Sequence, residues 1–113
     1  MKKNTLIITG VIILILIVAA LFYFLRNFGS EQETFIVSIE NFEFGPLFVN
    51  INIGESIAWK NEDSVIHDVT MDNGLFDVDI NPGENFTYTF NNIGTYEYHC
   101  DIHPSMKGTI KVE

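Results

Sequence analysis

The stretch YEYHCDIHPSMKGTIKV, residues 96–112, joins two runs of alternating apolar and polar side chains through a short turn. Successive side chains of a β-strand point to opposite faces, so Tyr98 and Cys100 are predicted to face inward while His99 faces solvent. A second strand is predicted to begin at Met106, with the same two-residue period. The chain therefore turns back on itself here, and its only cysteine lies beside the turn.

The two-residue period extends over most of the chain from residue 34 onward. Turn signals separate the runs: NIGE, NEDS, DNG, NPGE and NNIG. About seven short strands with this spacing predict an all-β antiparallel sandwich, in which each sheet has one apolar face. The other side chains predicted to face the core are Phe35, Val37, Ile39, Leu47, Val49, Ile51, Ile53, Ile57, Trp59, Val65, His67, Val69, Met71, Phe86, Tyr88, Phe90, Tyr96, Met106, Gly108, Ile110 and Val112.

An uncharged apolar run over residues 5–25 precedes this domain. A helix of that length spans roughly 31 Å, enough to cross a hydrocarbon core of ~30 Å. Two interpretations are open, a retained transmembrane anchor and a signal peptide cleaved after VAA (18–20). We expect the anchor, because cleavage there would leave LFYFL at the new N-terminus and the apolar run exceeds the usual signal core.

The anchor interpretation divides the chain into a cytoplasmic N-terminus (1–4), a transmembrane segment (5–25), a linker (26–33) and a β domain (34–113). Two lysines precede the apolar run and one arginine follows it, so the positive-inside rule puts the β domain outside the cytoplasm. A lone cysteine in an oxidising compartment has no partner for an intrachain disulfide.

The β domain is strongly acidic. From residue 31 onward the sequence has three lysines and fifteen carboxylates, which gives a net charge of −12. This charge repels nucleic acid, so we expect no nucleic-acid partner. It favours a partner with a basic docking surface, or it serves only solubility.

The softest donors of the chain gather at the turn. Cys100 and His103 bracket it, Met106 follows, and His67 on another strand can reach the same end of the sandwich. Taken singly, an inert buried cysteine and a hydrogen-bonded core histidine are ordinary alternatives. Together, one thiolate, two imidazoles and a thioether suit copper better than zinc, because a thioether is a poor zinc ligand.

Residues 34–113 resemble the cupredoxin family. The resemblance rests on FGP (44–46), Gly54, W-x-N (59–61), the Pro-Gly turn (82–83) and Y-x-Y-H-C-x-x-H-P-x-M-x-G-x-I-x-V (96–112). It implies a Greek-key sandwich and one type 1 copper held by His67, Cys100, His103 and Met106, with the short ligand loop of amicyanin-like members. Several relatives have Asn where this chain has Asp68, and a carboxylate can accept bracing hydrogen bonds but cannot donate them.

These features predict a membrane-anchored blue copper protein that moves single electrons between extracytoplasmic redox partners and is not an enzyme. With three histidines in the chain, a multicopper oxidase cluster cannot be built within one copy. A copper carrier or sensor that passes copper to another protein is the alternative, and a metal-free adhesion domain is a third.

Overall fold

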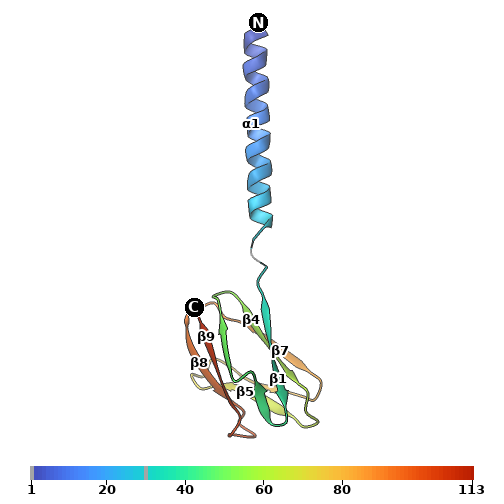
Figure 1. The fold of residues 1–113 in the computed structure, drawn as a ribbon, viewed down its shortest axis with the longest axis vertical. Helices are drawn as coiled ribbons and strands as arrows, with labels where there is room; N and C mark the ends of the chain where they lie inside the picture. The colour runs from blue at the N-terminus through green and yellow to red at the C-terminus, as the bar shows by residue number, and fades with distance from the viewer. Residues whose placement is uncertain (1, 30) are drawn as a thin grey trace. The chain divides into compact units, whose positions relative to one another are not determined.

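The computed structural model describes residues 2–29 and 31–113 (Figure 1). The chain forms one helix and nine strands within these ranges, and the strands all belong to a compact unit, Gln32–Glu113. The elements are α1 (Lys2–Asn27), β1 (Thr34–Glu40), β2 (Glu43–Gly45), β3 (Phe48–Ile51), β4 (Ser56–Asn61), β5 (His67–Met71), β6 (Asp77–Ile80), β7 (Asn85–Thr89), β8 (Gly94–His99) and β9 (Lys107–Val112).

The helix α1 is longer than the uncharged run that predicts it, because it also includes the flanking polar residues at both ends. None of its described residues is buried. Its length and apolar composition suffice to cross a membrane, and a signal sequence near the N-terminus can also meet these two criteria.

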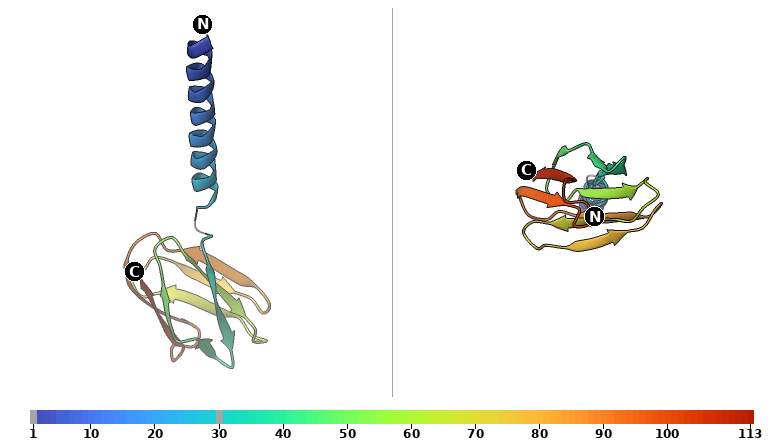
Figure 2. Two further views of the ribbon diagram at one scale, coloured as in Figure 1. Left: turned by 45° about the horizontal axis from the view of Figure 1, so that its top comes forward. Right: turned by 90° about the horizontal axis from the view of Figure 1, so that it is seen from below.

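The strands form two sheets, ordered β2-β1-β4-β7 and β3-β9-β8-β5-β6. The predicted sandwich is confirmed, but the sheets are mixed rather than purely antiparallel. β1 pairs with β4 in parallel, and β3 pairs with β9 in parallel. Alternation in a sequence identifies the face of a side chain but says nothing about the direction of the neighbouring strand. The two parallel pairings therefore could not be predicted from it. Figure 2 gives two further views of the sheets.

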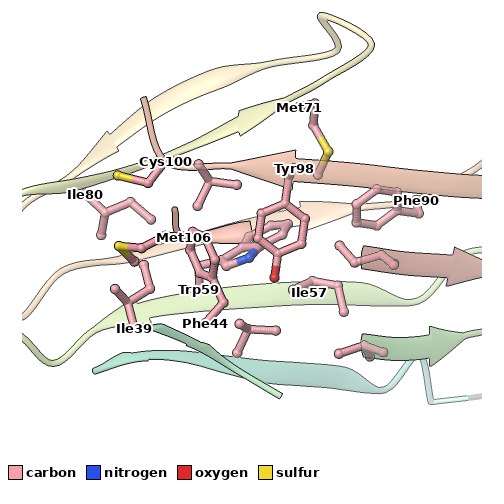
Figure 3. Close-up of a cluster of buried hydrophobic side chains, with 14 of the residues drawn as sticks. Ile39, Phe44, Ile57, Trp59, Met71, Ile80, Phe90, Tyr98, Cys100 and Met106 are labelled. Carbon is pink, nitrogen blue, oxygen red and sulfur yellow. The ribbon is translucent and has the colours of Figure 1, made fainter. Parts of the chain in front are cut away.

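Aromatic side chains fill the core between the sheets (Figure 3). Trp59 and Tyr98 are essentially inaccessible to solvent, and their rings meet edge to face with centroids 5.6 Å apart. Phe44 packs edge to face against Tyr98 at 4.8 Å. Such contacts add to the free energy gained from burying the rings, so this cluster stabilises the packing of the core.

Strand parity predicts most of the core correctly, including Tyr98 and Cys100. It is wrong for Leu47, Ile53 and Val65, whose side chains are 63%, 54% and 39% exposed. These three residues lie just outside β3 and β5, where the alternation of a strand no longer applies. Phe35, near the start of β1, is also exposed.

Tyr98 on β8 lies directly opposite Gly108 on β9. A Cβ atom added to Gly108 would overlap the Cζ and Oη atoms of the Tyr98 ring. The ring has no space to retreat, because Trp59 and Phe44 pack against it. Burial also raises the pKa of Tyr98 to about 12, so its hydroxyl stays neutral in the core. Glycine at position 108 is therefore a packing requirement of the core.

We expect Gly108→Ala to destabilise the domain by about 1–3 kcal/mol, the usual cost of overpacking a core. Urea unfolding of residues 30–113 measures this loss, since that fragment retains every residue of the core cluster. Gly45→Ala is the matched control, because a Cβ there meets no atom within 4 Å. Equal stability of the two variants would show that the Tyr98 ring moves aside freely.

Candidate metal centre

His67 is the first residue of β5, and its side chain is completely buried. Its Nδ1 atom lies 3.9 Å from the Sγ atom of Cys100. The other ring nitrogen, Nε2, lies 2.8 Å from a carboxylate oxygen of Asp63. Because an ionised carboxylate only accepts, Nε2 donates its hydrogen to Asp63, while Nδ1 faces the cysteine.

Cys100 follows β8 directly and is also completely buried. The Nδ1 atom of half-buried His103 lies 4.0 Å from its sulfur. The backbone closes this loop twice, by Cys100 N–H to the Met106 carbonyl at 3.1 Å and by Met106 N–H to the His103 carbonyl at 2.9 Å. The donor atoms of His67, Cys100 and His103 all lie within 4.8 Å of one another.

Met106 lies immediately before β9 and is 2% exposed. Figure 3 shows its sulfur and that of Cys100 at the same end of the core, near Ile39 and Ile80. Of the four candidate ligands named from the sequence, His67, Cys100 and His103 form the cluster, and the Met106 thioether lies at the same end of the core. One thiolate, two imidazoles and a thioether form the donor set of a copper electron-transfer site.

Asp68 joins β5 to the cysteine loop. Its backbone N–H points at the Cys100 sulfur, with an N···S distance of 3.4 Å. Its side-chain Oδ1 accepts a 2.7 Å hydrogen bond from the Asp101 N–H. The carboxylate therefore braces the loop as an acceptor, in agreement with the sequence-based expectation, although its side chain is buried. An N–H donor at a thiolate is one means by which a protein tunes a metal site.

His99 points away from the donor cluster, as parity predicted. Its ring lies between two carboxylates, with Nδ1 2.6 Å from Asp72 Oδ1 and Nε2 2.7 Å from Asp101 Oδ1. The hydrogen bond to Asp72 and then that to Asp101 raise the pKa of His99, because both favour the doubly protonated ring. Its ring is therefore engaged by carboxylates instead of facing open solvent.

Further carboxylates lie beside the cysteine loop. Thr70 Oγ1 lies 3.1 Å from Asp68 Oδ1, 2.9 Å from Asp77 Oδ1 and 3.3 Å from Asp101 Oδ2. A hydroxyl has one proton, so it can donate to only one of these oxygens at a time. The three carboxylates, with oxygens within 4.8 Å of one another, concentrate negative charge next to Cys100.

Asn61 and Asp63 shape the loop that leads into His67. Asn61 is completely buried, and its amide donates to the carbonyls of Val65 and Ile80, each at 2.8 Å. Its Oδ1 accepts from the Asp63 N–H at 3.0 Å, so all of its side-chain hydrogen-bonding groups are used. The W-x-N motif thus ends in a residue that organises this loop.

Asp63 could not be recognised from the sequence as a site residue, because NEDS (61–64) indicates only a turn. Its carboxylate accepts hydrogen bonds from the backbone N–H groups of Asn41 and Phe42, at 2.7 and 3.0 Å, as well as from His67. Burial alone would raise the pKa of Asp63, but the hydrogen bonds that it accepts, first that from Phe42, hold the pKa below its ordinary value.

Phe42 was also missed. Its ring meets the rings of His67 and His103 edge to face, with centroid distances of 5.3 and 4.9 Å. It is 49% exposed, so it lies at the surface while contacting both imidazoles. Phenylalanine in the turn between two predicted strands gives no signal of this role, since its long-range contacts depend on the turn geometry.

Comparisons with known proteins agree with this geometry. The sequence matches the cupredoxin-like domain family over residues 12–112. It is 33% identical over 87 residues to amicyanin from Paracoccus versutus, covering 72% of this chain and 66% of that protein. It is 32% identical over 84 residues to plastocyanin from Scenedesmus fuscus, covering 62% and 86%. The chain thus spans slightly less than two thirds of the length of that amicyanin.

Solved structures share the fold. A purple cupredoxin from Nitrosopumilus maritimus superposes with a TM-score of 0.64 at 29% identity, over 70% of this chain and 99% of that one. A copper-containing nitrite reductase from Thermus scotoductus gives 0.68 at 28% identity, over 74% of this chain but only 23% of the enzyme. A methionine variant of amicyanin in the Cu(I) state gives 0.65 at 23% identity, over 75% and 87%.

Copper is the metal that suits this site, because thiol, imidazole and thioether donors converge at one end of the sandwich. The family match covers most of the chain, including every strand described above. The chain therefore belongs to the cupredoxin-like domain family, whose fold is of the electron-transfer type.

Proposed function

We propose that this protein is a one-electron carrier whose type 1 copper would be held by His67, Cys100, His103 and Met106. The observation that carries the proposal is the convergence of two imidazole Nδ1 atoms on one buried thiol, at 3.9 and 4.0 Å. Copper, when bound, supplies a Cu(I)/Cu(II) couple. The protein residues hold the donors in place and exclude water.

The strands make the site rigid. His67 begins β5, Cys100 follows β8 and Met106 precedes β9, so three of the donors lie at strand ends. Because Cu(I) and Cu(II) prefer different geometries, a scaffold that does not rearrange between them suits rapid electron exchange. The two backbone hydrogen bonds that close the loop support this rigidity.

Electrons would enter and leave through His103. It is half-buried, whereas the other three donors are 0–2% exposed. Ile102, at 47% exposure, precedes it and Phe42 lies against its ring, so its surroundings at the surface are apolar. An apolar contact surface permits a partner to approach closely, while the surrounding carboxylates favour a basic partner.

We further propose that α1 anchors the β domain to the outer face of a cell membrane. The uncharged run is long enough to span the bilayer, and the basic N-terminus favours a cytoplasmic position for that end. The proposed function then operates between redox partners outside the cytoplasm.

A copper carrier or sensor is the alternative function. Carriers that release Cu(I) use exposed methionine or histidine donors. Here Met71 is 2% exposed and packs in the core, and His99 is engaged by carboxylates. These contacts favour an electron carrier. We propose that the β domain has no enzymatic activity of its own, because its three histidines cannot also supply a multicopper cluster or a histidine-rich second copper centre.

Residues 30–113 should bind one copper per chain and turn blue with Cu(II), because a thiolate in a His₂Cys site gives an intense visible absorption. Cys100→Ser should remove the colour. Visible spectra with metal analysis measure both. A folded fragment that binds only colourless Cu(I) would favour the carrier, and one that binds no copper would favour a metal-free domain.

His103→Ala should open the site to external ligands, so that added imidazole restores or alters the absorption spectrum. His99→Ala should leave the spectrum nearly unchanged, because its ring bonds Asp72 and Asp101 instead of the donor cluster. Spectral titration of both variants with imidazole makes the comparison. The reverse pattern would mean that His99 is the ligand.

The second-order rate of electron transfer to a basic redox protein should fall steeply with salt. The Debye length shrinks from ~10 Å at 0.1 M to ~3 Å at 1 M, which screens attraction to the carboxylates. Ile102→Lys should slow the reaction even at high salt, because it disrupts the short-range apolar contact. Stopped-flow kinetics test both; rates independent of ionic strength would exclude a basic partner.

A further inference from the structure

One carboxylate connects the candidate metal centre to a distant turn. Asp63 Oδ2 lies 2.8 Å from His67 Nε2 and 3.0 Å from the Phe42 backbone nitrogen, while Oδ1 lies 2.7 Å from the Asn41 nitrogen. The carboxylate side chain is only 12% exposed, and the histidine side chain is not exposed at all. The hydrogen bond between these two side chains is therefore largely shielded from competing water.

The turn that Asp63 binds is unusual. Asn41 and Phe42 separate β1 from β2, and Glu40 pairs with Glu43 across the turn. Both turn residues are left-handed, with φ of 53° and 60°. Two-residue hairpins of this type normally use glycine, because a side chain at positive φ is strained, most of all a bulky one. The turn must therefore be stabilised by other contacts. The Asp63 carboxylate accepts hydrogen bonds from the backbone N–H groups of both turn residues.

The turn geometry determines where the Phe42 ring lies. The ring packs edge to face on His67 and His103, whose own rings lie 4.9 Å apart. A right-handed backbone at Phe42 would direct the side chain elsewhere. The same carboxylate that orients His67 thus also fixes the ring that covers both histidines.

We propose that Asp63 is a positioning residue of the metal centre, which sets the orientation and tautomer of His67 and also seats Phe42 over the two imidazoles. This inference rests on the proposed function for its copper-dependent part. The hydrogen bond to Nε2 leaves Nδ1 free to face Cys100, and the negative charge stabilises the more positive oxidised state. The Phe42 ring limits the access of water and small ligands.

The test compares variants of the full chain in detergent micelles. Asp63→Ala removes all three hydrogen bonds. Asp63→Asn keeps the shape and one acceptor oxygen but removes the charge, so it serves if the alanine variant does not fold. Phe42→Ala removes the cover and leaves the carboxylate. Glu62→Gln is the matched control, because it removes the same charge from the neighbouring residue, whose side chain pairs with Lys60.

Two readouts use the metal-free chain. Nitrogen-15 NMR of the His67 ring should show the Nε2–H tautomer in the wild type and in Phe42→Ala, and a mixture of tautomers in Asp63→Ala. Amide exchange at Asn41 and Phe42 should be faster in Asp63→Ala than in the wild type. Unchanged tautomer and exchange in both Asp63 variants would overturn the proposal, whether or not the protein binds copper.

Two further readouts use the copper-loaded chain. Asp63→Ala should weaken copper binding by about 10- to 100-fold in competition with a chelator, the usual effect of losing such a partner. The reduction potential should rise in both Asp63 variants. Phe42→Ala should mainly speed the reaction of the copper with added azide. An equal rise in potential in Glu62→Gln would show a general charge effect and overturn the tuning role.

If the wild-type chain takes up no copper, the proposed function is wrong. The His67 tautomer and the amide exchange of the metal-free chain would still test the positioning role of Asp63. The two failures are therefore distinguishable.

Discussion

The pairing register of β5 and β8 is the constraint on which the site depends. Thr70 pairs with His99 and Met71 with Tyr98, after which the regular ladder between these strands stops. Two hydrogen bonds extend the connection, from Asp68 N–H to the Cys100 sulfur and from Asp101 N–H to the Asp68 carboxylate. A shift of one residue would turn His67 and Cys100 to opposite faces, since side chains alternate along a strand.

The burial of the donors follows from the same register. His67 begins β5 and Cys100 directly follows β8, and both side chains point into the sandwich. Both are therefore buried and lie close to each other. His103 escapes full burial because it belongs to the turn after β8. The sheet thus provides an enclosed side and an open side of one cluster. This asymmetry supports the proposed path of electrons through His103.

The sequence predicted the fold and the four candidate donors because both depend on local patterns. The period of two identified the inward face of Tyr98 and Cys100, and the spacing of soft donors around one turn indicated the metal. It did not predict the parallel pairings, since partner and direction are properties of chain connections across the sandwich. It also failed for Val65, because the residue precedes the first residue of β5.

The role of Asp63 was beyond prediction for a different reason. Its partners are backbone N–H groups 22 and 21 residues away, and such groups look alike at every position of a sequence. Phe42 escaped notice because a large side chain at positive φ contradicts the local preference that sequence reasoning uses. Both residues break or bypass a local rule, and residues that do so are often found at functional sites.

The contact between Tyr98 and Gly108 has an evolutionary consequence. The tyrosine ring occupies the space that a side chain on the facing residue would need, so the two positions share one volume. The two positions are therefore coupled: a side chain at 108 costs stability unless the residue at 98 becomes smaller. Because Tyr98 lies two residues before Cys100 and both belong to the buried core, a smaller residue at 98 would also loosen the packing beneath the donor cluster. Selection for an intact metal centre is therefore expected to act on Gly108 as well, through its contact with Tyr98.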